Sequence, residues 1–168
     1  MAHPDLEYAL GDAVMDDITT TDGARLRDVK GLLENVENQL SYVRRIAQSR
    51  IDIARSELSQ RTAGRQRSEL ADVIRRLPEV LSEQTPHTGL PRFAAPEIDP
   101  EPEYAVELDE IGPPTMILDI GVLTRSELRE VIVRLESVEA RTSVQRRIVQ
   151  ERIDQLHHAI ASDVHTSF

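Results

Sequence analysis

At 168 residues, the chain can form one domain of ordinary size or one elongated element with extensions. Only 39% of its residues are hydrophobic and 3% aromatic, which excludes a wide aromatic core and favours a narrow helical assembly that packs along a seam. The absence of cysteine excludes disulfides and thiolate metal sites, and the net charge of −10 is a poor match for general DNA binding.

Acidic residues are concentrated in two stretches of the chain. Residues 1–22 carry six acids and residues 97–119 carry eight, and neither stretch contains Lys or Arg. The remaining residues are mildly basic, so they suit a small anion, while the acidic stretches suit a basic protein partner. We interpret residues 1–22 as an acidic N-terminal tail without signal-peptide features. No apolar run approaches ~18 residues, so we expect a cytoplasmic protein without a membrane span.

A long helix is predicted at residues 23–63. Its apolar residues alternate in steps of three and four, which is typical of a coiled-coil seam; they are Leu26, Val29, Leu33, Val36, Leu40, Val43, Ala47, Ile51, Ala54 and Leu58. Gly64 ends this pattern. A shorter amphipathic helix is expected within residues 64–85, with an interruption near Pro78.

Residues 86–123 are expected to form a linker rich in proline and acids. Seven prolines lie between residues 86 and 114, and this composition favours an extended or disordered segment. The short apolar patch at residues 115–123 is left with two interpretations, since it can dock back onto the helices or contact a partner.

A second long helix is predicted at residues 124–164. Thr124 and Glu127 have the spacing of a capping box, which marks its start. Thr142 and Gln145 interrupt an otherwise apolar seam, whose other members are Leu128, Val131, Leu135, Val138, Val149, Ile153, Leu156 and Ile160. An offset of 102 residues aligns the two long helices, and fifteen of the twenty-seven positions in 26–52 and 128–154 are identical. The duplication predicts an all-α fold, namely an antiparallel two-helix coiled coil with a short extra helix and a linker.

Five polar residue types recur at the same spacing in both long helices. They are Glu37, Ser41, Arg44, Gln48 and Asp52 in the first copy, and Glu139, Ser143, Arg146, Gln150 and Asp154 in the second. At 100° per residue each set falls within an arc of about 80°, one position beyond the seam. Such a flank is commonly a solvated surface with Glu–Arg pairs. Serine and glutamine do not contribute to such pairs, however, and the set is better kept than the seam.

This set of side chains suits a ligand with guanine-like edges and phosphates. Carboxylates accept from the N1–H and N2 amine of guanine, and Arg donates to guanine O6 and N7 or to phosphate. If the two helices are antiparallel, the two polar sets line one groove and form two equivalent half-sites. We therefore expect a ligand that is itself two-fold symmetric.

The doubled pattern E-x3-S-x2-R-x3-Q-x3-D resembles that of the RsiG family, the cyclic di-GMP-dependent anti-sigma factors of sporulating actinobacteria. All five positions match in each copy. The resemblance implies that the ten motif residues bind a dimer of cyclic di-GMP, two nucleotides per chain. It also implies that the loaded protein sequesters a WhiG-type sigma factor and represses sporulation genes. Because both motifs are in one chain, the expected state is a monomer that binds the sigma factor 1:1 without contacting DNA.

Other functions remain as alternatives. An enzyme is not expected, because the sequence has no Gly-rich phosphate loop and no nucleophile paired with a base. Asp154, His157 and His158 include an Asp–His pair with a spacing that a metal site can use, but a solvated helix end is the favoured interpretation. A coiled-coil adaptor without a nucleotide is one rival, and a cyclic di-GMP receptor that acts on a partner other than a sigma factor is another.

Overall fold

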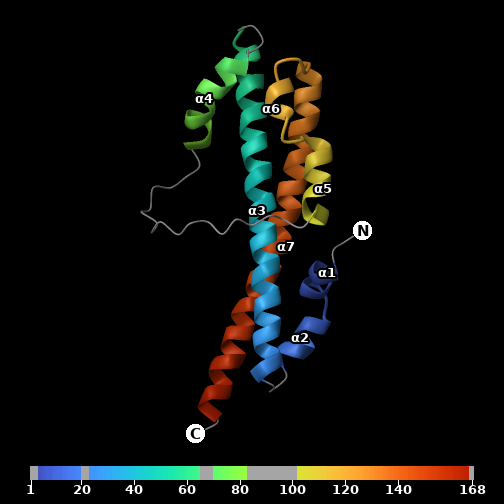
Figure 1. Cartoon of the computed structure of the whole chain (residues 1–168), viewed down its shortest axis with the longest axis vertical. Helices are drawn as coiled ribbons and strands as arrows, with labels where there is room; N and C mark the ends of the chain where they lie inside the picture. Colours follow the sequence, from blue (N-terminus) through green and yellow to red (C-terminus); the bar gives the residue numbers. More distant parts are fainter. Residues whose placement is uncertain (1–3, 20–22, 65–69, 83–101, 167–168) are drawn as a thin grey trace.

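The computed structural model describes residues 4–19, 23–64, 70–82 and 102–166, and within these ranges all regular elements are helices. They are α1 (Pro4–Leu10), α2 (Ala13–Ile18), α3 (Gly23–Thr62), α4 (Leu70–Ser82), α5 (Pro102–Ile111), α6 (Met116–Asp119) and α7 (Arg125–Thr166). Helices α3 and α7 run antiparallel along the length of the molecule and make its most extensive contact (Figure 1). The predicted all-α helical hairpin is therefore confirmed.

The seam between α3 and α7 is the centre of the fold. Helix α3 buries nine of its predicted seam residues, which are Leu26, Val29, Leu33, Val36, Leu40, Val43, Ala47, Ile51 and Ala54. Helix α7 buries Leu128, Leu135, Val138, Val149 and Leu156. Thr142 is buried in the same seam, whereas Gln145 is half-buried. Each fully buried Leu or Val contributes about 1.5–3 kcal/mol through the removal of apolar surface from water, so this seam holds the two helices together.

The ends of the long helices follow from local sequence. At the start of α7, the Thr124 amide donates to Glu127 Oε2 (2.6 Å), and the Glu127 amide donates to Thr124 Oγ1 (3.2 Å). This is the reciprocal capping box that the sequence predicts. Gly64 follows α3 with a φ of 79°, in the left-handed region that terminates helices and favours glycine.

Within residues 4–19, the expected acidic tail is wrong. This segment forms α1 and α2, which lie beside the half of α3 that begins at Gly23 (Figure 1). Ala9, Val14 and Ile18 are buried against the hairpin, so the few apolar residues of this acidic segment are spaced to pack. Glu7 and Asp12 remain exposed, and the acids outnumber the apolar residues that pack, so composition alone suggests a tail.

The expected linker is also wrong from residue 102 onward, and residues 86–101 lie outside the described part of the chain. Helix α5 packs Leu108 and Ile111 against both long helices. The apolar patch at residues 115–123 docks back onto the hairpin, because Met116 and Ile120 are buried. Leu118 and Val122 in the same patch remain exposed.

The internal duplication includes the short helices. The order α1–α2–α3 recurs as α5–α6–α7, and the offset of 102 residues that aligns the long helices also aligns buried residues of the short ones. Val14 corresponds to Met116 and Ile18 to Ile120, and all four are buried. We refer to residues 4–62 as repeat 1 and to residues 106–164 as repeat 2. Helix α4 lies between the repeats in sequence.

Helix α4 forms within the range 64–85 predicted for a short helix, although residues 65–69 and 83–85 are outside the described part. It contains Pro78 and buries Val73 next to Ile53 and Ile120. A buried ion pair lies at this end of the hairpin, where Arg61 Nε donates to Glu57 Oε1 (2.6 Å). The same guanidinium donates to the Ile120 carbonyl (2.8 Å) and thereby ties the end of α3 to the segment after α6.

Candidate ligand-binding site

The two polar stripes meet along the groove between α3 and α7. The stripe of α3 consists of Glu37, Ser41, Arg44, Gln48 and Asp52, and that of α7 of Glu139, Ser143, Arg146, Gln150 and Asp154. Each stripe lies one position beyond the buried seam, as the periodicity predicts. Nine of the ten side chains are half-buried, and Asp154 is exposed.

Glu37 is the centre of one half of this groove. Its Oε1 atom accepts from Ser41 Oγ (2.9 Å) on the same helix and from Gln150 Nε2 (3.1 Å) on α7. The guanidinium of Arg146 also donates to it from α7, at 3.2 Å. One carboxylate thus gathers three of the polar types that the motif repeats.

Glu139 is the centre of the other half and repeats this arrangement. Its Oε1 atom accepts from Ser143 Oγ (2.9 Å) on α7 and from Gln48 Nε2 (3.0 Å) on α3. Arg44 Nη1 lies 3.9 Å from the same oxygen, an ion-pair distance that is longer than its counterpart. Each half-site therefore takes Glu and Ser from one helix and Arg and Gln from the other, which is an approximate two-fold arrangement.

Two guanidinium nitrogens in the groove have no hydrogen-bond partner. The Nε atoms of Arg44 and Arg146 are both buried and unpaired, although their Nη1 atoms face the opposing glutamates. A buried donor without an acceptor costs about 1–3 kcal/mol. An acceptor that reached these two atoms would remove that cost, so both arginines are suited to bind an anionic or carbonyl oxygen.

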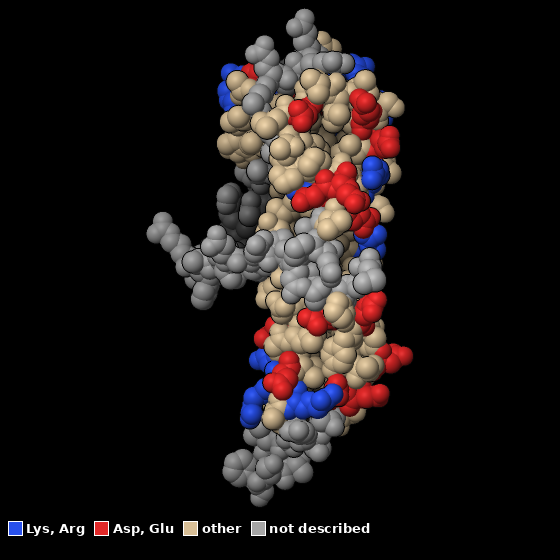
Figure 2. All heavy atoms as spheres, turned by 45° about the vertical axis from the view of Figure 1, so that its right-hand side comes forward, with Lys and Arg blue, Asp and Glu red and all other residues tan. Residues whose placement is uncertain are grey.

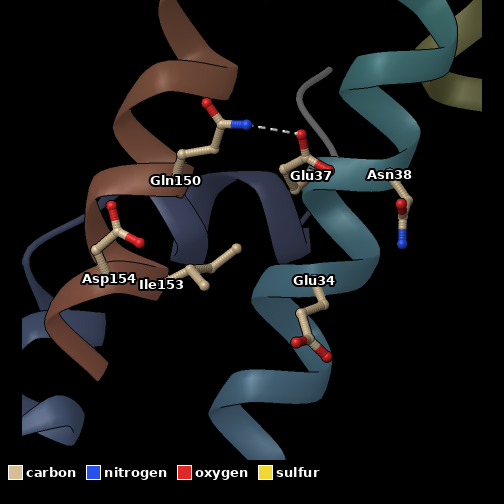
Figure 3. Close-up of a pocket in the computed structure, with 6 residues that line it drawn as sticks. All are labelled: Glu34, Glu37, Asn38, Gln150, Ile153 and Asp154. Carbon is tan, nitrogen blue, oxygen red and sulfur yellow. Dashed lines mark hydrogen bonds between the residues drawn. The ribbon is translucent and has the colours of Figure 1, made fainter. Parts of the chain in front are cut away.

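An open pocket lies at the Glu37 end of the groove. It has a volume of ≈620 Å³ and is lined by Glu34, Glu37, Asn38, Gln150, Ile153 and Asp154. Figure 3 shows Gln150 of α7 reaching across the gap to Glu37 of α3, with Asp154 one turn further along α7. Sequence reasoning did not include Glu34. Its position three residues before Glu37, on the same face, was the available signal.

Residues 12–81 match the family model described as RsiG-like. This part of the chain is similar to that family. The match covers α2, α3 with its complete motif, and α4 except Ser82, whereas the second motif on α7 lies beyond it. No curated protein matches the sequence. A match to this family suggests an anti-sigma role, with a sigma factor as the general partner.

Two arginines next to the motif arginines point away from the groove. Arg45 is exposed, and its Nε donates to the Ser41 carbonyl (3.2 Å). Arg147 is exposed as well and pairs with Glu151 (3.1 Å) on its own helix. Both arginines are therefore matched controls for Arg44 and Arg146, since they have the same chemistry but lie outside the site.

No cluster of candidate metal ligands occurs in the described part of the chain. Within residues 4–19, 23–64, 70–82 and 102–166 there is no group of three or more His, Cys, Asp or Glu that could hold an ion. The ring of His158 contacts the backbone carbonyl of Asp154 (2.7 Å), which is a contact within the helix. In the same ranges, no helix combines the length and apolarity needed to cross a membrane.

A separate polar cluster joins the N-terminal helices to α3. Tyr8 donates to Asp17, and Arg25 binds the same carboxylate through Nε (2.7 Å) and Nη2 (2.9 Å). The hydrogen bonds from Arg25 and then from Tyr8 lower the pKa of Asp17. Burial, followed by the hydrogen bond to Asp17, raises the pKa of Tyr8 to about 12. This cluster fastens α1 and α2 to the start of α3 and is not part of the groove.

Proposed function

We propose that the chain is an anti-sigma factor whose groove binds a dimer of cyclic di-GMP. In the loaded state it sequesters a WhiG-type sigma factor and thereby represses sporulation genes. The observation that carries this proposal is the two-fold arrangement around Glu37 and Glu139. The RsiG-like match over residues 12–81 supports the anti-sigma role.

The side chains of the groove complement the functional groups of this nucleotide. Arg44 and Arg146 provide charged donors for phosphate or for the O6 and N7 atoms of guanine. Glu37, Glu139 and the two motif aspartates accept from the N1–H and N2 groups of guanine. Ser and Gln add neutral hydrogen bonds. A two-fold ligand dimer fits a groove in which each half-site offers the same groups in the opposite direction.

Binding exchanges contacts within the protein for contacts with the ligand. Glu37 and Glu139 each face Ser, Gln and Arg, so a guanine or phosphate must displace some of these donors. The unpaired Nε atoms of Arg44 and Arg146 gain acceptors in return. The two nucleotides of one ligand dimer supply these acceptors to both half-sites. We therefore expect two nucleotides to bind cooperatively to one chain.

The partner surface is proposed to be the acidic face formed by the short helices. Glu107, Asp109, Glu110 and Asp119 are exposed on α5 and α6. Figure 2 shows acidic side chains gathered on the upper part of this face. Sigma factors present basic surfaces to promoter DNA, and such surfaces are complementary in charge to this face. The complex should therefore weaken as the salt concentration rises.

A coiled-coil adaptor without nucleotide is the second candidate. The observation in its favour is that the groove satisfies much of its own polarity, because Glu37 and Glu139 each accept hydrogen bonds from both helices. In that case the repeated stripe only stabilises the hairpin and fixes its register.

Two measurements on the purified chain test the proposal. Calorimetry with cyclic di-GMP should give saturable binding at two nucleotides per chain. A pull-down of a WhiG-type sigma factor should then succeed with nucleotide and be lost or much reduced without it. No heat of binding at high nucleotide concentration would favour the adaptor. Binding of nucleotide without any capture of the sigma factor would indicate a receptor that acts on another partner.

A further inference from the structure

The two ends of the groove differ, although the motifs that line it are the same. At the Glu139 end, Arg55 of α3 reaches across to Glu136 of α7, with 2.6 Å between Nη2 and Oε1. Both residues lie one turn beyond the motif. At 100° per residue they fall within the arc of the motif stripes, so this ion pair spans the groove at that end.

At the Glu37 end, the corresponding residues do not cross the groove. The offset of 102 residues relates Arg55 to His157 and Glu136 to Glu34. The structure describes both residues and records no ion pair between them. Glu34 instead pairs with Lys30 on its own helix, at 3.6 Å. The open pocket of ≈620 Å³ is found here, with Glu34 among its lining residues.

Two differences between the repeats produce this asymmetry. The first is His157 in place of an arginine. The second is Lys30, whose counterpart in repeat 2 is Ile132, a buried residue of the apolar core. Because Ile132 cannot pair with Glu136 along α7, that carboxylate is available to Arg55. Lys30 holds Glu34 along α3 in the equivalent place, so the Glu37 end stays open.

We infer that the Arg55–Glu136 ion pair makes the two half-sites load in order, the Glu37 end first and the Glu139 end second. This inference rests on the proposed function and concerns the regulation of the same site. The first nucleotide enters the open pocket at the Glu37 end, where no ion pair that corresponds to Arg55–Glu136 has to be separated. The second must separate Arg55 from Glu136, after which the guanidinium of Arg55 is free to donate to the anionic ligand.

The ion pair is suited to set an order and not to block the site. Its side chains are 57% and 41% exposed, so water screens the attraction. An exposed pair of this kind shifts an equilibrium by about two- to fivefold. An effect of this size biases the order in which the two half-sites are filled while leaving both accessible.

A matched pair of substitutions separates this effect from simple electrostatics. Glu136→Gln and Glu34→Gln each remove one negative charge at corresponding positions, so both favour an anionic ligand equally through net charge. Calorimetry of the full chain with cyclic di-GMP should show that Glu136→Gln tightens the second step about two- to fivefold more than Glu34→Gln does. Equal effects of the two substitutions would overturn the inference.

A double variant introduces the arrangement of Arg55 and Glu136 at the Glu37 end of the groove. Lys30→Ile combined with His157→Arg reproduces the arrangement around Arg55 and Glu136, and it leaves the net charge unchanged when histidine is neutral. The first binding step should weaken by about two- to fivefold. Unchanged or tighter binding would contradict the inference, once circular dichroism shows that the variant retains its helices. If the wild-type chain binds no nucleotide at all, the proposed function itself fails, and this outcome is distinct from the other two.

Discussion

Arg50 and Arg152 occupy corresponding positions of the two repeats, and each binds the end of a short helix that belongs to the other repeat. Arg50 of α3 donates to the Leu108 carbonyl (3.0 Å) and to Asp109 (2.8 Å) on α5. Arg152 of α7 donates to the Ala9 carbonyl and to the Leu10 carbonyl (2.9 Å) at the end of α1. The last carbonyls of a helix have no partner within it, so a guanidinium that binds them fixes the helix in place.

Replacing either arginine with alanine should loosen only the helix that it binds. The Arg50 side chain is 12% exposed, and loss of its charged hydrogen bonds should cost about 1.5–3 kcal/mol each in the stability of the local contact. Hydrogen exchange should therefore become faster in α5 for Arg50→Ala and in α1 for Arg152→Ala. Arg45→Ala, which removes an exposed arginine of α3, is the control. Exchange that rises equally in both short helices would show that the two contacts are not independent.

Arg44 and Arg146 should be required for nucleotide binding, whereas their neighbours Arg45 and Arg147 should not. Each charged hydrogen bond to a guanine edge or phosphate contributes about 1.5–3 kcal/mol. Alanine at either groove position should therefore weaken binding of the shared ligand dimer roughly ten- to hundredfold. Calorimetry with cyclic di-GMP measures this loss. Equal losses for Arg44→Ala and Arg45→Ala would mean that the polar stripe is not the binding surface.

The buried pair of Glu57 and Arg61 should be important for stability. Replacing Arg61 alone should lower the free energy of unfolding more than replacing both residues. Glu57 is 1% and Arg61 4% exposed, so Arg61→Met leaves a buried carboxylate without its main partner, at a cost of about 3–5 kcal/mol. The double variant Glu57→Leu with Arg61→Met should recover part of that loss, because no unpaired charge remains buried. Urea unfolding measures both changes in free energy. Arg147→Met, at an exposed pair, should change the free energy of unfolding by less than about 1 kcal/mol.

The cluster of Tyr8, Asp17 and Arg25 predicts a dependence of stability on pH at both extremes. The pKa of Asp17 is lowered from 3.8 in the folded chain, so its contribution is present above that value and is lost as the pH falls through the lower, folded pKa. The pKa of Tyr8 is raised from 10.0 to about 12, so its contribution is present below pH 10.0 and is lost as the pH rises towards about 12.

A chain in which Tyr8 is the one remaining tyrosine allows this pKa to be measured directly. Tyr42→Phe with Tyr104→Phe removes the other two tyrosines. The ultraviolet absorbance of the phenolate should then titrate near pH 12. Asp17→Asn should lower the midpoint without returning it to 10.0, because burial is the larger cause of the shift. A midpoint at 10.0 in the parent variant would mean that α1 does not dock as described.

The long helices were predictable because their seams obey one periodicity over many turns. Leu33 and Leu135 are fully buried where the pattern places them, and the capping box of Thr124 and Glu127 forms as expected. The short helices were not predictable from composition. Their acids outnumber the few apolar residues that pack. Val14 and Ile120 can be identified as core residues only once the hairpin against which they are buried is known.

The positions of the motif residues on the groove were predictable, but their partners were not. The spacing places Glu37 and Gln150 on the flanks of two helices. Only the register between the antiparallel helices brings Gln150 Nε2 to 3.1 Å from Glu37 Oε1. The difference between the two ends of the groove could not be predicted from the sequence for the same reason. Arg55 and Glu136 are unremarkable charges in the sequence, and they are far apart in it until the helices pair.

The covalent connection between α3 and α7 has a consequence for dilution. When two separate molecules form a groove, they dissociate and the groove is lost once their concentration falls below the dissociation constant of the dimer. In this protein both helices that line the groove belong to one polypeptide. The effective concentration of one wall for the other is set by the connecting segment and remains constant however few copies are present. A response that depends on this groove should therefore keep the same midpoint in a titration at nanomolar or micromolar protein, so long as the ligand is in excess.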